Sequence, residues 1–359
     1  MKNIDIFYIY QEQIIFLRMI TSIISLATCF IIIVLYLLLL YQVKFSNNPN
    51  KAESENNNTI NNETTINSNK TNKIGLGSHY MFFLVISNFF GALVEGSLYI
   101  YLNKDDIKYP ETDYFKKLSD TSYCKGYAFF HNFFELSGIC WTTMITKLFY
   151  YSTQIVITGS QKQQMAKAFT YSFLSSLIIS ILPVIFGGYG FAYTHCSFVK
   201  KDFDNSNTHT LSIIFGVILT IFIILNALFY IYALFKSYSF YKKKIKQLKE
   251  QNEGEYSSLK VYVYLFFIFP IVLMITRIMK LIQFFVDFLD KEEWIYIVII
   301  LTYINSILYC LTGTFDSAFC FFFFRGVYKT CCTQNNQVID PMDDETIISN
   351  EVKQFTPTS

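Results

Sequence analysis

Long apolar stretches separated by short polar segments dominate this chain of 359 residues. The seven stretches are residues 19–43, 79–102, 126–152, 166–190, 210–235, 261–286 and 294–319. A helix needs about 20 apolar residues, at ~1.5 Å of rise each, to cross a hydrocarbon core about 30 Å thick. Because lipid offers no hydrogen-bond partners to the backbone, each stretch is expected to be helical. The pattern predicts an all-α membrane protein, a bundle of seven transmembrane helices.

Composition supports the membrane class. Hydrophobic residues make up 52% of the chain and aromatic residues 19%, against 16% charged residues. A soluble protein of this composition would have too little polar surface to cover its apolar residues. The net charge of +2 excludes a strongly cationic nucleic-acid binder. The first stretch is too long for a cleaved signal peptide, so it is interpreted as a retained helix.

Lysines predict the orientation, because Lys and Arg are enriched in cytoplasmic loops. Residues 236–260 contain seven lysines, whereas the segments 191–209 and 287–293 contain three between them. The lysine-rich segment is therefore expected on the cytoplasmic side of the plasma membrane, which the chain crosses several times. The predicted organisation is a short extracellular N-terminus at 1–18, a transmembrane domain at 19–330 and a disordered cytoplasmic tail at 331–359.

An Asn-rich insertion at 45–73 is expected to be a disordered intracellular loop. It contains three glycosylation sequons, at Asn57, Asn62 and Asn69. None would be modified on the cytoplasmic side, and an Asn/Thr-rich tract generates such sequons by chance. The alternative, that the sequons are used, would reverse the orientation.

Two pairs of cysteines fall outside the apolar stretches. Cys124 and Cys196 are the two on the expected outer, oxidising face, so a disulfide is their natural pairing, with two free thiols as the alternative. Cys331 and Cys332 follow an aromatic and basic run, residues 321–329, that could lie along the inner interface as a short eighth helix. These juxtamembrane cysteines are candidates for palmitoylation, or else unmodified cytosolic thiols.

Two local stretches carry a resemblance to a known family. Residues 124–141 (CKGYAFFHNFFELSGICW) resemble the third helix of the cyclic-AMP-receptor-like proteins of social amoebae, which are G-protein-coupled receptors. Residues 181–190 (ILPVIFGGYG), which lead to Cys196, are similar to the fourth helix and outer loop of that family. One departure is that Ser197 and Phe198 stand where relatives usually carry Trp after the loop cysteine.

The resemblance implies a receptor for an extracellular small molecule, such as cyclic AMP or another small anion. It also implies a heterotrimeric G-protein as the intracellular partner, alongside contact with membrane lipids. No enzymatic activity and no cofactor are expected, and no His or Cys spacing suggests a metal site.

Ionisable residues inside the apolar stretches are the candidate ligand contacts, because such residues are costly in a membrane. Glu95, Glu135, Arg277 and Lys280 all lie in the middle or outer half of the predicted bundle. Arg277 and Lys280 would bind an anion, and the two glutamates would hold the empty site together or meet a donor on the ligand. Alternatively, pairs such as Glu95–Arg277 fix helix register only, and Lys280 snorkels to the interface.

A hinge is predicted where Pro270 and Gly313 weaken the sixth and seventh helices, although static kinks are the alternative. The fifth helix is expected to continue inward through a basic stretch, since Ile245 and Leu248 recur at helical spacing. That stretch would face a G-protein or anionic lipid, or would be a solvated basic face. The residues expected to face the G-protein are Lys242, Lys243, Lys244, Lys246 and Asp316.

A small transporter or channel is the alternative class, with Glu95, Glu135 and Arg277 lining a solute path. Transporters often contain internal repeats and broken helices, and no convincing repeat relates the halves of this chain. An intramembrane enzyme is disfavoured, because the chain lacks a His-Glu-x-x-His motif and a nucleophile elbow.

Overall fold

The computed structural model describes residues 2–46, 76–101, 118–153, 160–192, 195–198, 207–251, 282 and 295–333. Its elements are six long helices and one strand pair, in the order α1 (Lys2–Ser46), α3 (Leu76–Tyr101), α6 (Ser122–Thr153), α7 (Gln161–Ile185), β1 (Tyr189–Ala192), β2 (His195–Phe198), α8 (Asn207–Gln251) and α10 (Ile295–Thr333). Six of the seven expected helices are therefore present. The remaining stretch, 261–286, lies outside the described residues apart from 282, and with it Pro270, Arg277 and Lys280.

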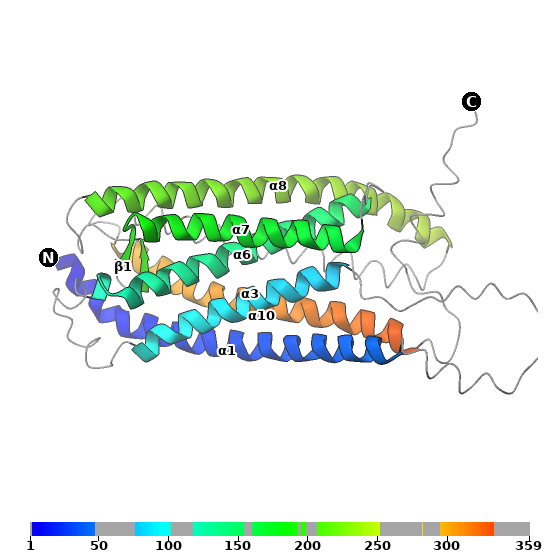
Figure 1. Ribbon diagram of the computed structural model, residues 1–359, viewed down its shortest axis with the longest axis horizontal. Coiled ribbons are helices and arrows are strands. Elements are labelled where there is room, and N and C mark those ends of the chain that lie inside the picture. The colour runs from blue at the N-terminus through cyan, green and yellow to red at the C-terminus, as the bar shows by residue number, and fades with distance from the viewer. Residues whose placement is uncertain are drawn as a thin grey trace, which may run out of the picture.

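The helices run side by side along the length of the bundle (Figure 1). Helices α1, α3 and α10 pack against one another, and α7 packs against α8. Helix α6 lies between these groups and contacts α3, α7, α8 and both strands. Residues 135–146 of α6 are all buried, which makes α6 the central helix of the bundle.

Five helices are long and apolar enough to cross a membrane within the part of the chain that the structure describes: α1, α3, α7, α8 and α10. The lipid-facing positions of α1 illustrate why, since Phe30 is 58% exposed and Leu37 51% exposed. Helix α6 is not among these five. It can carry polar side chains such as Asn132 and Ser137 because they are buried against other helices and do not face lipid. The expected fold class, an all-α membrane bundle, is confirmed.

Helices α1 and α8 extend well beyond the apolar stretches. Helix α1 begins at Lys2, well before the expected start at 19, because Ile14 and Ile15 are buried against the bundle at 0% and 2% exposure. No Gly or Pro interrupts residues 2–18, so the helical backbone continues unbroken. Helix α8 runs through the basic stretch to Gln251, so the expected helical extension of the fifth helix is present, and its inward direction stays a prediction.

Helix α7 ends at Ile185, five residues before the expected boundary at 190. The chain turns at Gly187, whose φ of 74° is a left-handed conformation that glycine adopts without strain. It then enters an antiparallel pair of strands in which Phe191 is opposite Cys196. This hairpin was not predicted from the sequence.

The expected short eighth helix is wrong as a separate element. Helix α10 is continuous from Ile295 to Thr333, because residues 319–333 contain no proline and only one glycine, Gly326, to interrupt the ladder of backbone hydrogen bonds. Cys331 and Cys332 therefore lie in the last turns of this long helix. Their palmitoylation stays a prediction.

Gly313 lies where α10 approaches α1 closely. A Cβ atom added at Gly313 would lie 2.0 Å from Ser25 Oγ and 3.2 Å from Ser25 Cβ. Small residues at helix contacts let membrane helices approach closely, so packing explains this glycine. Its expected role as a hinge stays a prediction.

Replacing Gly313 with Ala should therefore destabilise the protein by about 1–3 kcal/mol, the usual range for overpacking. Removing the obstructing side chain in the double variant Gly313→Ala/Ser25→Gly should restore much of the loss. Thermal unfolding of the purified protein in detergent measures both. Gly126→Ala is the matched control, because nothing lies within 4 Å of a Cβ atom at that position. Equal stability of the Gly313 and Gly126 variants would contradict the close approach.

Candidate ligand-binding site

The disulfide predicted between Cys124 and Cys196 is confirmed, with an S–S distance of 2.08 Å. It joins the first turn of α6 to β2, and both cysteines are fully buried. The strand pair packs against α6 and α8 at this end of the bundle, hereafter the disulfide end (Figure 1). The bridge therefore fixes the hairpin beside the helix that contributes most polar side chains to the interior.

A charged cluster lies inside the disulfide end. It consists of Arg18, Glu95, Tyr127 and His131, and is called the Glu95 cluster below. The Tyr127 hydroxyl donates to Glu95 Oε2 at 2.6 Å, and His131 Nε2 lies 2.8 Å from Glu95 Oε1. Arg18 Nη1 lies 3.9 Å from the same Oε1. The carboxylate thus meets side chains of both α1 and α6.

Burial makes these contacts energetically important. Glu95 is 7% exposed and His131 3% exposed. A carboxylate removed from water is costly unless hydrogen bonds and a nearby positive charge compensate. Arg18 also donates from Nε to Ser306 Oγ at 3.3 Å. The cluster consequently links four helices, α1, α3, α6 and α10.

A second imidazole approaches the cluster from the hairpin. The ring centroids of His131 and His195 are 6.0 Å apart, and the Tyr127 ring stacks on His131 at 5.8 Å. His195 directly precedes Cys196 in β2, so the disulfide positions it. Two histidines, one from α6 and one from the hairpin, therefore lie next to each other, and His131 contacts the buried carboxylate.

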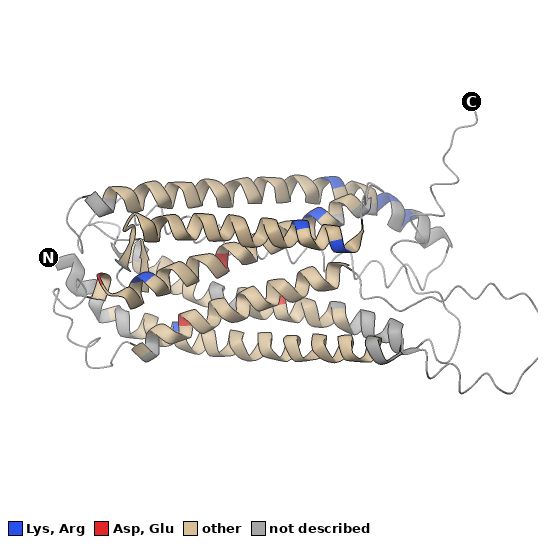
Figure 2. Ribbon diagram, viewed as in Figure 1, with Lys and Arg blue, Asp and Glu red and all other residues tan. Residues whose placement is uncertain are grey.

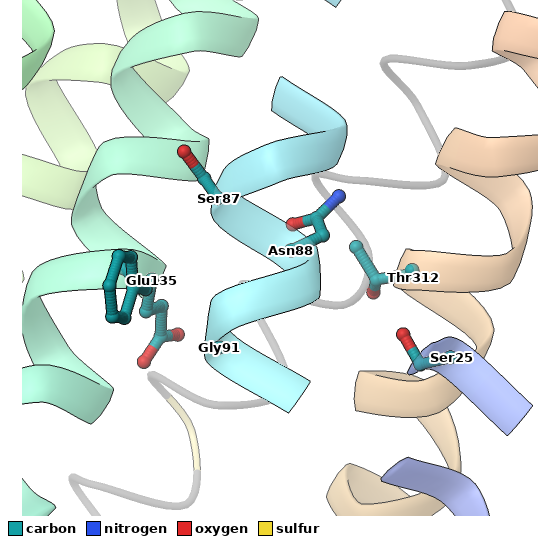
Figure 3. A pocket seen from close by; sticks show the side chains of 8 residues that line it. Ser25, Ser87, Asn88, Gly91, Glu135 and Thr312 are labelled. Carbon is teal, nitrogen blue, oxygen red and sulfur yellow. The ribbon is translucent and has the colours of Figure 1, made fainter. Parts of the chain in front are cut away.

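Glu135 lies one helical turn beyond His131 on α6 and is 6% exposed. It lines a separate small cavity with residues of α1, α3 and α10 (Figure 3). That cavity has room for about one water molecule. In this conformation it is suited to a buried water rather than to a larger ligand. The other lining residues are Ser25, Ser87, Asn88, Gly91, Phe134, Thr312 and Gly313.

Asp316 corrects one expectation. It is 1% exposed, and its Oδ2 accepts a hydrogen bond from Asn88 Nδ2 at 2.5 Å. Because α10 continues far beyond residue 316, this carboxylate lies inside the bundle between α3 and α10 and does not face a partner. Lys242, Lys243 and Lys246, by contrast, are exposed on the extension of α8, whereas the Lys244 side chain lies outside the described residues.

The sequence identified Glu95 but not its cation. The structure places Arg18 beside Glu95, where a pair with Arg277 was one expectation. Arg18 was missed because it lies before the first charge-free stretch and the helical leader was not recognised. An arginine that directly precedes a long apolar stretch, within reach of the neighbouring helices, is the signal that could have found it.

Comparison with known proteins supports the fold. No protein-family model and no curated protein matches the chain. The crystal structure of squid rhodopsin is similar over 99% of this chain and 93% of its own, with a TM-score of 0.57 and 16% sequence identity. At this identity the likeness shows the fold alone. The chain therefore has a rhodopsin-like bundle of membrane helices.

Proposed function

We propose that the chain is a G-protein-coupled receptor that binds an extracellular small molecule in the disulfide-end half of the bundle. The observation that carries the proposal is the rhodopsin-like fold with a charged cluster buried beside a disulfide-fixed hairpin. Squid rhodopsin is itself a G-protein-coupled receptor. Buried ionisable groups in a membrane bundle commonly mark binding sites.

The charge distribution supports an extracellular N-terminus. Lysines gather at the end opposite the disulfide, on α6, α7 and α8, as Figure 2 shows. Cytoplasmic ends carry such an excess, and a disulfide belongs on the oxidising side. This end would then offer Lys242, Lys243, Lys244 and Lys246 to a heterotrimeric G-protein, in a plasma membrane.

The ligand class is proposed from the resemblance to cyclic-AMP-receptor-like proteins in residues 124–141 and 181–190. It favours cyclic AMP or another small anion. Arg277 and Lys280 remain proposed anion contacts, and Pro270 a proposed hinge for rearrangement of the sixth helix; these three lie outside the described residues. Activation would follow if the ligand prefers one arrangement of that helix.

A transporter is the second candidate, and the structure supports it less than it supports a receptor. Glu95 is held by Tyr127 and His131, and the cavity beside Glu135 has room for about one water molecule. Neither arrangement resembles a solute path through the bundle.

Guanine-nucleotide exchange on a co-expressed G-protein tests the proposal. Wild type and Arg277→Ala would be compared across extracellular small anions, including cyclic AMP, at equal surface expression. Activation of the wild type by one anion, lost in Arg277→Ala, is the expected result. No exchange with any ligand, together with solute uptake that depends on Glu95 or Glu135, would establish the transporter instead.

A further inference from the structure

Lysines are concentrated at the end of the bundle opposite the disulfide, hereafter the lysine end (Figure 2). Every lysine of α6, α7 and α8 except Lys125 lies toward this end. The acids of these three helices are Glu135, which lies inside the bundle, and Glu250 in the last turn of α8. The lysine end of these helices therefore carries an excess of positive charge, which suits an anionic partner.

Two of these lysines, Lys147 of α6 and Lys236 of α8, lie where the apolar part of each helix ends. Lys236 is about one turn before the end of the apolar span Thr210–Phe240, and Lys147 is less than two turns before the end of α6 at Thr153. The other lysines of α8 lie beyond the span. Lysines at the ends of membrane helices extend their ammonium groups to the level of the lipid headgroups.

A tyrosine ring lies under each of the two ammonium groups. Lys147 Nζ is 5.7 Å from the ring centroid of Tyr151, and Lys236 Nζ is 6.0 Å from that of Tyr232. Cation–π attraction operates over this distance and fixes the position of the ammonium without neutralising its charge. Neither lysine forms an ion pair with a residue that the structure describes. Both charges are thus placed but not balanced by a described carboxylate.

Contact between α6 and α8 brings the two lysines to one site. The rings of Tyr150 and Tyr232 are 6.1 Å apart, and both helices run from the disulfide end to the lysine end (Figure 1). Counted from this contact, Lys147 is one turn closer to the disulfide end and Lys236 one turn further away. At 1.5 Å per residue, their backbones are about 10 Å apart along the helix axes. A headgroup that carries phosphates at two depths can contact both.

The site is open to the surrounding lipid. Tyr151 and Tyr232 are both exposed, and Phe235, next to Lys236, is 73% exposed. Closer to the disulfide end, exposed apolar residues of α8 such as Leu228 continue the same lipid-facing surface. An acyl chain can therefore lie along α8 while its headgroup is at the lysines. Tyrosine suits this boundary, because its ring is apolar and its hydroxyl is polar.

We propose that Lys147 and Lys236 bind the headgroup of a phosphoinositide, a phospholipid that carries phosphate groups on an inositol ring. The phosphodiester lies deeper, against Lys147, and a phosphate of the ring lies further out, against Lys236. Basic pockets between transmembrane helices on the cytoplasmic side bind such headgroups. Phosphatidylserine has no phosphate at the outer level, so it would leave Lys236 without a phosphate partner. The inference uses the proposed orientation but neither the proposed extracellular ligand nor the G-protein.

Binding of fluorescent lipids to the purified full-length protein in phosphatidylcholine-containing detergent micelles tests the inference. Fluorescence anisotropy gives the affinity for phosphatidylinositol bisphosphate and for phosphatidylserine with the same acyl chains. We expect the bisphosphate lipid to bind at least about fivefold more tightly, the equivalent of one further lysine contact at about 1 kcal/mol.

Variants locate the site. Lys147→Gln and Lys236→Gln should each weaken binding of the bisphosphate lipid about fivefold, and the double variant about 25-fold. Replacement of either lysine with Arg should retain most of the affinity, because the charge remains. Tyr232→Leu should weaken binding more than Tyr232→Phe, which keeps the ring under Lys236. Lys162→Gln is the matched control, because Lys162 is exposed on α7 at the same end, and this variant should bind like wild type.

Equal affinity of the wild type for the two lipids would overturn the inference, and this comparison decides even if a variant does not fold. Equal weakening by Lys162→Gln, Lys147→Gln and Lys236→Gln would also overturn it, since diffuse attraction would then explain the binding. A loss confined to replacements of Lys242 and Lys243 would place the contact on the extension of α8 instead.

The outcome is separable from that of the proposed function. Selective lipid binding with this pattern, but without nucleotide exchange under any ligand, would contradict the receptor and keep the lipid site. Ligand-activated exchange together with equal affinity for the two lipids would do the reverse.

Discussion

Replacing Cys124 or Cys196 with Ser is expected to destabilise the folded protein by about 4 kcal/mol and to abolish most surface expression. The bond closes a loop with a sequence separation of 72 residues, and the entropy that such a bridge removes from the unfolded chain grows with loop length. The hairpin would also lose its covalent attachment to α6, releasing His195 from its place beside His131. Cell-surface labelling and thermal unfolding measure both effects.

The double variant Cys124→Ser/Cys196→Ser should be no worse than either single variant, because one bond is lost in all three cases. Cys140→Ser is the matched control: Cys140 is buried, is in no disulfide and lies 3.4 Å from Ser175 Oγ, which can hydrogen-bond a replacing hydroxyl. This control should express nearly normally. Independent, additive losses at Cys124 and Cys196 would contradict a functional bridge.

The transmembrane helices could be predicted because a helix that spans the hydrocarbon core needs a long run of apolar residues. Helix α6 was still recognisable, because Lys125, Glu135 and Lys147 are its only Asp, Glu, Lys or Arg residues and long apolar runs separate them. Its central position could not be predicted, because which helices become neighbours depends on packing and not on hydropathy. The disulfide was found by elimination, from two cysteines on one face.

Short features that depend on tertiary context could not be predicted from the sequence. The strands β1 and β2 have four residues each, and Tyr-Gly-Phe-Ala has no strong strand pattern. Their pairing depends on the turn at Gly187 and on the bond at Cys196. The position of Asp316 was misjudged because the end of α10 was placed too early, which moved this carboxylate from the interior to the membrane surface.

Only part of the candidate site could be predicted, because its residues come together through tertiary packing. Glu95 was evident as an acid within an apolar stretch. Its partners Arg18 and Tyr127 come from two other helices, and their convergence requires the rotation of each helix to be known. Arg18 shows this most clearly, because its side chain reaches the cluster only if residues before the first apolar stretch are helical.

Replacing Glu95 with Leu is expected to cost about 3–5 kcal/mol, the range for breaking a buried charge pair by removing one partner. The change leaves the Arg18 guanidinium in a poorly solvated site and removes the acceptor for the Tyr127 hydroxyl. Arg18→Leu should cost less, about 1–3 kcal/mol, because Glu95 would keep its contacts with Tyr127 and His131. Thermal unfolding of the purified variants at pH 7.0 gives both values.

The double variant Arg18→Leu/Glu95→Leu decides whether the two charges stabilise each other. Since removing both partners leaves neither charge buried alone, its cost should fall short of the sum of the single costs by about 1–3 kcal/mol. Glu95→Gln should be milder than Glu95→Leu, because an amide oxygen can still accept from Tyr127. Strict additivity would mean that the 3.9 Å approach of Arg18 contributes nothing to stability, and that Tyr127 and His131 alone hold Glu95 in place.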